Sequence, residues 1–161
     1  MSENVRLRVG FTGSRNYPQP VLVGNFVGVL ALKYPDVVVI SGGRGAVDRA
    51  AEVAAVNNRL NVISFRPRMD GIDVYESLDG AELRLRSQML AHNDFTLNCF
   101  FRNGLIAEAA RVVGFWDMKS RGTADTLSKA KGKGRPRTVY GPDGRQLTEE
   151  EVDRIVHEVL T

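Results

Sequence analysis

A glycine cluster at the end of an apolar run is the part of this sequence best suited to chemistry. Val37–Ile40 predicts a strand buried on both faces, because β-branched side chains fit a covered pleat. The segment Ser41-Gly42-Gly43-Arg44 follows, and an apolar helical pattern begins near Val47. Glycine permits a sharp turn with bare amide groups, and a helix N-terminus favours an anion. The arrangement predicts a phosphate-binding turn.

Small and basic residues also follow other predicted strands. Gly13-Ser14-Arg15 comes after the first strand, Arg66 after the third and Ser120-Arg121-Gly122-Thr123 after the fourth. Hydroxyl and amide groups donate hydrogen bonds to phosphate oxygens, and a guanidinium group pairs with phosphate through two bonds. Glycine turns also serve purely steric purposes, but their repetition with hydroxyls and arginines favours an anionic, nucleotide-like ligand. The sequence contains neither a dinucleotide fingerprint nor a Walker A loop.

Catalysis on such a ligand would need a carboxylate. Hydrolysis of an N-glycosidic bond requires a group that stabilises oxocarbenium-like charge or activates water. Asp48 and Asp117 are the predicted catalytic residues, and Glu52, Glu108 and Asp125 are further candidates by position. Each has a structural alternative: Asp48 serves equally well as a carboxylate at a helix N-terminus, and Asp117 as a turn residue. For base stacking, Tyr17 is a weak candidate and Trp116 is more typical of a core ring.

Hydrophobic periodicity and turn signals place these motifs on alternating strands and helices. The predicted strands cover residues 5–12, 37–40, 61–65, 111–116 and 136–140. The predicted helices cover residues 21–33, 47–57, 81–93, 100–110, 124–131 and 148–160. Thr148 and Glu151 have the spacing of a capping box at the start of the last helix. Residues 66–71 are a predicted loop, and residues 70–80 an irregular polar segment that forms a lid or an insertion.

This alternation predicts the α/β class. We expect a Rossmann-like, doubly wound, mostly parallel sheet of about five or more strands flanked by helices. Residues 1–161 are expected to form a single domain. Ligands of such sheets bind beyond the C-terminal ends of the strands, which is where the glycine and arginine motifs fall.

The composition is that of an ordinary globular protein, with 43% hydrophobic and 25% charged residues. A net charge of +3 permits an anionic ligand or nucleic acid without requiring either. The basic stretch Lys129–Arg137 carries much of the excess charge, and a solvated face is its simplest explanation. His92 and His157 lack partners at metal-ligand spacing, so we expect no metal and no cofactor.

The cellular location predicted from the sequence is the cytoplasm. The first residues carry no signal-peptide pattern, and no apolar run is long enough for a bilayer, so no membrane association is expected. Cys99 is the single cysteine, which fits a reducing compartment, and its apolar neighbours predict a small buried side chain rather than a nucleophile.

Several of these motifs together resemble the SLOG superfamily, and most closely its small bacterial and phage YspA-like proteins. The resemblance covers about residues 5–140 and rests on the order of the motifs. They are Gly13-Ser14-Arg15, the segment Ser41–Ala51, Phe65-Arg66-Pro67, Arg102-Asn103, Phe115-Trp116-Asp117 and Ser120-Arg121-Gly122-Thr123. The superfamily also includes the LOG phosphoribohydrolases and DNA processing protein A.

The resemblance implies a Rossmann-like fold that binds nucleotides or nucleotide-derived ligands at its glycine-rich strand ends. It assigns Gly13, Ser14 and Arg15 to the near side of the ligand, and Ser41–Arg44 to its sugar or phosphate. Arg102 and Asn103 match the Arg-Asn pair of the family. Ser120, Gly122 and Thr123 match its phosphate loop, and Asp48 matches an aspartate in its Gly-x-Asp-x-x-Ala pattern.

One departure concerns catalysis. Where the LOG hydrolases have a catalytic glutamate three residues after Gly-Thr, this chain has Thr126. Asp125 is adjacent, but on a helix it would point about 100° away. We therefore expect a sensor or sequestering module that binds a nucleotide-like ligand.

Two alternatives to a binding module stay open. One is a nucleoside-monophosphate phosphoribohydrolase or another N-glycosidase. The other is a single-stranded DNA-binding protein that uses Lys129–Arg137, although this stretch lacks interleaved aromatic residues. The apolar faces of the predicted helices between Ala81 and Ala110 also suggest a homodimer.

Overall fold

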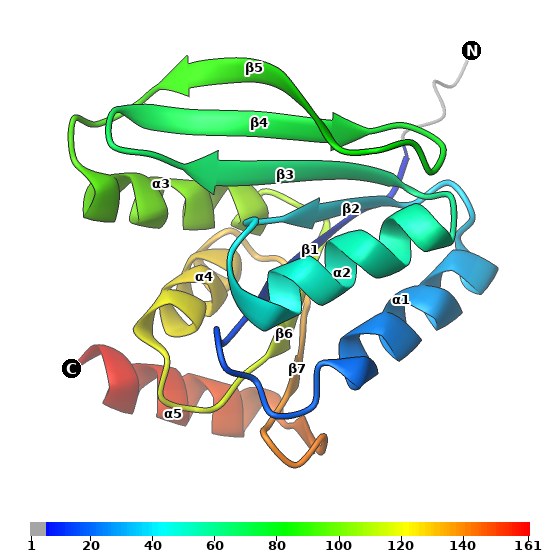
Figure 1. Cartoon of the computed structure of the whole chain (residues 1–161). Coiled ribbons are helices and arrows are strands. Elements are labelled where there is room, and N and C mark those ends of the chain that lie inside the picture. Colours follow the sequence, from blue (N-terminus) through cyan, green and yellow to red (C-terminus); the bar gives the residue numbers. More distant parts are fainter. Residues whose placement is uncertain (1–5) are drawn as a thin grey trace.

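The computed structural model describes residues 6–161, which form eight strands and five helices (Figure 1). The strands are β1 Arg8–Gly13, β2 Val38–Ser41, β3 Asn61–Pro67, β4 Gly71–Ser77, β5 Arg84–Leu90, β6 Arg111–Phe115, β7 Arg137–Tyr140 and β8 Gln146–Leu147. The helices are α1 Val21–Lys33, α2 Gly45–Asn57, α3 Phe95–Ala107, α4 Arg121–Gly132 and α5 Glu149–Leu160. Val5, where the first strand was predicted to begin, lies outside the described residues.

All strands of the described range join one sheet, in the order β5-β4-β3-β2-β1-β6-β7-β8. The five strands from β3 to β7 in this order are parallel, whereas β4, β5 and β8 pair antiparallel. From β1 the chain proceeds outward to β2 and β3, and it later returns to the other side of β1 as β6. The edge between β1 and β6 is therefore a topological switch point. The predicted α/β class and the Rossmann-like, mostly parallel sheet are confirmed.

Helices cover both faces of the parallel strands. α1 and α2 pack together on one face, in front of the sheet in Figure 1. α3, α4 and α5 pack in sequence on the other face. This division follows from the right-handed crossovers of parallel strands, which place helices on opposite faces on the two sides of the switch point.

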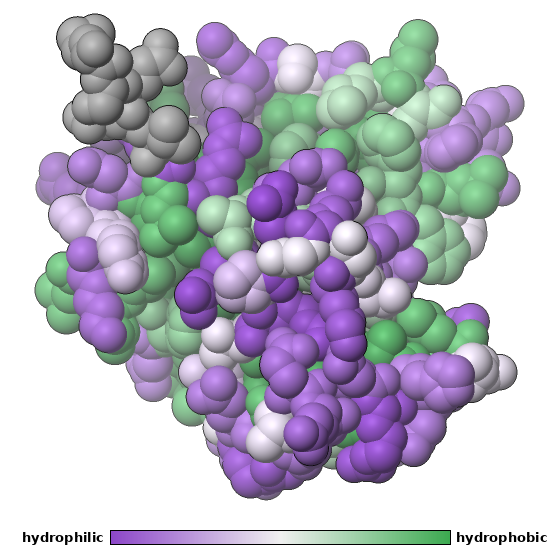
Figure 2. Space-filling view, turned by 180° about the vertical axis from the view of Figure 1, so that it is seen from behind, coloured by the Kyte–Doolittle hydropathy of each residue, from purple (hydrophilic) through white to green (hydrophobic). Residues whose placement is uncertain are grey.

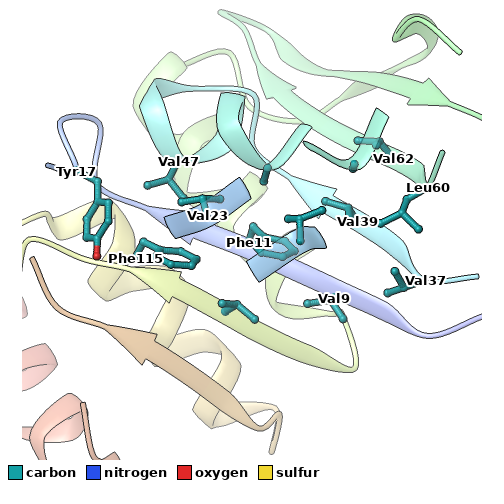
Figure 3. Packing of buried hydrophobic residues seen from close by; sticks show 14 residues of the cluster. Val9, Phe11, Tyr17, Val23, Val37, Val39, Val47, Leu60, Val62 and Phe115 are labelled. Atoms are coloured by element: carbon teal, nitrogen blue, oxygen red, sulfur yellow. The ribbon is translucent and has the colours of Figure 1, made fainter. Parts of the chain in front are cut away.

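The largest core cluster lies between the sheet and the layer of α1 and α2 (Figure 3). Phe11 of β1 and Phe115 of β6 face Val23 of α1 and Val47 of α2, and all four side chains are buried. Tyr17 belongs to this cluster, where its hydroxyl donates a hydrogen bond of 2.6 Å to the Gly141 carbonyl. These contacts place Tyr17 in the core.

A second cluster lies under α4 and α5 and contains Trp116. The indole is fully buried, and its Nε1 group donates to the Ser120 carbonyl at 3.1 Å. Trp116 is therefore a core residue that also anchors the loop before α4.

Residues 70–93 contain the largest errors of the predicted secondary structure. The segment expected to be irregular at 70–80 includes β4, and the segment expected to be helical at 81–93 includes β5. Tertiary pairing explains the second error: β5 pairs antiparallel with β4, from Gly71 opposite Leu90 to Glu76 opposite Arg84. β5 itself adds nothing to the buried core, because six of its seven residues are exposed.

Local signals predicted the end of α2 and the start of α5 correctly. Thr148 and Glu151 form the expected capping box at the start of α5. Asn58 ends α2, as predicted, and its side chain donates to the Ala54 carbonyl at 2.7 Å. α3 and α4 begin earlier than predicted, at Phe95 and Arg121. None of the helices within residues 6–161 combines the length and apolar character that a membrane span requires.

Candidate functional site

A cavity of about 450 Å³ lies at the C-terminal ends of the parallel strands, next to the switch point between β1 and β6. Its walls come from the end of β1, from α3 and from the N-termini of α2 and α4. Nine of the predicted site residues line it: Gly13, Arg15, Arg44, Asp48, Arg102, Asn103, Ser120, Gly122 and Thr123. Residues that are distant in the sequence therefore line the same cavity.

The N-terminus of α4 faces this cavity with its first-turn amides available. Ser120 is the N-cap residue, and in the described part of the chain its side chain makes no capping hydrogen bond. The first amides of a helix have no intrahelical acceptor, so a group in the cavity can accept from Gly122 and Thr123. The helix dipole adds partial positive charge at the same point.

The N-terminus of α2, by contrast, is partly satisfied within the protein. The Arg44 amide donates to Oδ2 of Asp48 at 2.8 Å, and the Ala46 amide donates to the Arg15 carbonyl at 3.1 Å. The glycine cluster thus folds back on Asp48 and on the loop after β1. The first-turn residues Gly122 and Thr123 of α4 line the cavity, whereas residues 45–47 of α2 do not.

Asp48 is the carboxylate at the base of the cavity. Burial raises its pKa to about 7, while the charge of Arg102 and the amides of Arg44 and Gly42 oppose that rise. The neighbouring charge of Glu52 contributes to the rise. A group with this pKa exchanges its proton near neutral pH, which is the property that a general acid or base needs.

Arg102 and Asn103 of α3 connect the two turns that face the cavity. Arg102 is buried, and its Nη1 group donates to the Gly42 carbonyl beside Asp48. Nε of Arg102 donates to Oδ1 of Asn103 at 3.0 Å. The Asn103 amide in turn donates to the Gly122 carbonyl at 3.3 Å and to Asp125 at 3.0 Å. Burial lowers the pKa of Arg102, and the nearby charges of Arg44 and Arg15 lower it further.

Ser41 and Arg66 belong to a buried network centred on Glu52, outside the cavity. Both Ser41 and Ser64 donate to Oε2 of Glu52, the second at 2.7 Å, and Arg66 donates to Oε1 at 3.0 Å. The Arg66 guanidinium lies 4.2 Å from the centroid of the Tyr75 ring. These contacts hold the end of β3 against the end of β2.

Ser14 and Asp117 also make internal contacts, and these contacts account for both residues without a ligand. Ser14 is buried and accepts a hydrogen bond from the Asp117 amide at 2.9 Å. Oδ1 of Asp117 accepts from the amides of Lys119 and Ser120, each at 2.8 Å. Burial alone would raise the pKa of Asp117. The hydrogen bonds to its carboxylate outweigh burial, so the pKa lies below its ordinary value. A carboxyl group with a lowered pKa is a poor proton donor, and the turn role predicted as its alternative describes Asp117 here.

Arg121 points away from the cavity. Its Nη1 group donates to the Val159 carbonyl near the end of α5, at 3.0 Å. Gly42 and Gly43 also lie outside the cavity wall: Arg102 contacts the first, and the side chain of Arg66 covers the second.

Several residues that line the cavity were missed by the sequence analysis. Phe95, Cys99 and Phe100 of α3 form one wall, and Nη1 of Arg44 lies 3.6 Å from the Cys99 sulfur. For Phe95 and Cys99, the error followed from the late predicted start of α3. Asp94 was an available signal, because it is an N-cap residue whose side chain accepts from the Leu97 amide at 2.9 Å.

The remaining candidate carboxylates, Glu108 and Asp125, are each paired with a lysine of the basic stretch. Asp125 binds Lys129 at 2.8 Å, and Glu108 binds Lys133 at 2.8 Å. Lys131 and Arg137 both contact Asp153 of α5. Within residues 6–161, no group of three His, Cys, Asp or Glu side chains is arranged to hold a metal ion.

Gly45 offers a test of how tightly the turn before α2 is built. Its φ is +78°, and a methyl group at this position would lie 2.8 Å from Cα of Arg15. We expect Gly45→Ala to lower the free energy of unfolding by about 1–3 kcal/mol, because strained backbone and contact with fixed backbone combine. Chemical denaturation measures the change. Gly28→Ala is the control, since the space around Gly28 is open, and it is expected to be neutral or stabilising. Equal stability of the two variants would contradict the prediction.

Together, the fold and the cavity define a Rossmann-like α/β protein with three arginine side chains and a free helix terminus at its switch point. Comparisons of the chain with protein-family models, curated proteins and solved structures found no match.

Proposed function

We propose that this protein binds a nucleotide or a nucleotide-derived phosphorylated ligand in the cavity beside the switch point. The observation that carries the proposal is the convergence of Arg15, Arg44 and Arg102 on the same cavity as the free N-terminus of α4. A phosphate group there would accept from the amides of Gly122 and Thr123. Guanidinium groups and a helix N-terminus both favour phosphate, and they act together in a partly enclosed space.

The proposal includes membership of the SLOG superfamily. In support, the segments that resemble the family follow three adjacent parallel strands, β2, β1 and β6, and Arg102-Asn103 reaches the same place from α3. Within this proposal, the protein acts as a sensor or sequestering module for its ligand. The pairing of Lys131, Lys133 and Arg137 with carboxylates gives no support to a DNA-binding role for the basic stretch.

Two arginines at the same end of the sheet allow a matched test. We expect Arg15→Ala to weaken binding of nucleoside monophosphates by about 10- to 100-fold, the effect of losing a hydrogen bond between charged groups. Arg121→Ala is expected to leave binding unchanged, because Arg121 contacts the Val159 carbonyl instead. Titration calorimetry with adenosine and guanosine monophosphates measures both. Equal effects of the two variants, or no binding by the unaltered protein, would overturn the proposal.

A hydrolase of N-glycosidic bonds is the second candidate function, and Asp48 is the observation that favours it. This carboxyl group lines the cavity and has a pKa of about 7, so it can protonate a leaving base or activate water near neutral pH. Chromatography of nucleoside monophosphates after incubation with the protein would reveal the free base. Release that persists unchanged in Asp48→Asn would exclude this role for Asp48.

A further inference from the structure

The geometry points to a second binding region in the same cavity, in which the phenyl rings of Phe95 and Phe100 bind a planar aromatic base. This inference rests on the proposed function, because it describes how the far end of the same ligand is held. It assigns the phosphate to α4 and Arg15, and the base to the N-terminal turns of α3.

The wall that α3 contributes changes character along the helix. Phe95, Cys99 and Phe100 line the cavity over the first turns together with Thr96, whereas the charged and amide side chains of Arg102 and Asn103 line it further along, before Ile106. Phe95 and Arg102 are separated by about 10 Å of helix axis. A ligand that has one apolar end and one anionic end would match this order.

Both aromatic residues already make cation–π contacts. The Arg44 guanidinium lies 4.8 Å from the centroid of the Phe95 ring, and Nζ of Lys129 lies 5.7 Å from that of Phe100. Guanidinium planes and phenyl rings are the two surfaces on which proteins stack nucleobases. Arg44 can therefore contact a base through its plane as well as attract phosphate through its charge.

Exposed apolar surface at this place supports the assignment. Phe100 is 38% exposed although it faces the cavity. In Figure 2, apolar residues gather over the region of α3, and the molecular outline is hollowed just below them. A bound base would cover apolar surface that otherwise contacts water.

Phe101 provides an unusually close control. It is adjacent to Phe100, has the same side chain and is 39% exposed, but it does not line the cavity. Its ring instead contacts His92, with the ring centroids 6.1 Å apart. A general effect of losing an exposed phenyl ring from α3 would therefore appear equally in both variants.

The experiment compares adenosine monophosphate with ribose 5-phosphate, which has no base, by titration calorimetry. We expect the nucleotide to bind the unaltered protein more tightly by about 5- to 150-fold, the contribution of one base–aromatic stack. Phe95→Ala and Phe100→Ala are each expected to weaken binding of adenosine monophosphate more than binding of ribose 5-phosphate, and so to remove much of this difference. Phe101→Ala should change neither affinity. Phe95→Leu, which keeps apolar volume, replaces Phe95→Ala if the latter does not fold.

The outcomes separate this inference from the proposed function. Equal affinity of the unaltered protein for the two ligands would overturn the aromatic site and leave phosphate binding intact. Equal effects of Phe100→Ala and Phe101→Ala would likewise overturn it. If neither ligand binds, the proposed function fails and the inference fails with it.

Discussion

Glu52→Ala is expected to lower the free energy of unfolding by about 2–4 kcal/mol, because it leaves buried hydroxyl groups without an acceptor. Glu52 is buried on α2 and accepts hydrogen bonds from Ser41, Ser64 and Arg66. Its loss would leave two buried hydroxyls and a guanidinium group without their acceptor. Because Ser41 precedes the glycine cluster, the same variant should also disturb the turn that carries Arg44.

Chemical denaturation monitored by circular dichroism tests this expectation. Glu108→Ala is the control, because Glu108 is an exposed carboxylate whose partner Lys133 remains solvated after the change, and little loss is expected. Glu52→Gln should lie between the two, since the amide oxygen still accepts but its charge is absent. The role given to Glu52 would be wrong if the two alanine variants were equally stable.

The stability of the protein is expected to fall as the pH rises from about 5 to 8, because Asp48 ionises in a buried site. The pKa of Asp48 is about 7 in the folded protein, against 3.8 for an ordinary aspartate. Between these values the folded state holds a proton that the unfolded state has lost, so raising the pH favours unfolding. The difference corresponds to about 4 kcal/mol between full protonation and full ionisation of Asp48, of which about 3 kcal/mol falls between pH 5 and pH 8.

Thermal unfolding of the protein and of Asp48→Asn at pH 5 and pH 8 measures this effect. The unaltered protein should lose about 5–10 °C in Tm over this interval, whereas Asp48→Asn, which cannot ionise, should lose much less. Asp125→Asn is a matched control, because Asp125 is an aspartate near the same cavity that is paired with Lys129. Glu151, whose pKa is lowered to about 2, changes stability only in acid and does not interfere. A pH dependence that is unchanged in Asp48→Asn would contradict the assignment.

Much of the fold could be predicted because its strongest signals are local. The β-branched run before Ser41 predicted a buried strand, and Thr148 with Glu151 predicted the start of α5; both elements are present. The alternation of such elements was enough to predict a parallel sheet and therefore the edge at which a site would lie. β5 was missed because its helix-forming residues become a strand only through pairing with β4, which no local pattern contains.

The candidate site shows the same division residue by residue. The sequence alone predicted that glycines, hydroxyls and arginines follow the parallel strands, because these residues come directly after the predicted strands in the chain. Only the tertiary structure decided which of them face the cavity. Arg15 faces it, but Arg66 binds Glu52 and Arg121 binds the end of α5, because their hydrogen-bond partners come from other elements. Likewise, the glycine cluster was evident from the sequence, but in the folded chain its Arg44 amide donates to Asp48, and the helix whose first-turn residues line the cavity is α4. The physical reason is that composition and spacing specify local backbone conformation, whereas the direction and pairing of a polar side chain depend on groups brought to it by folding.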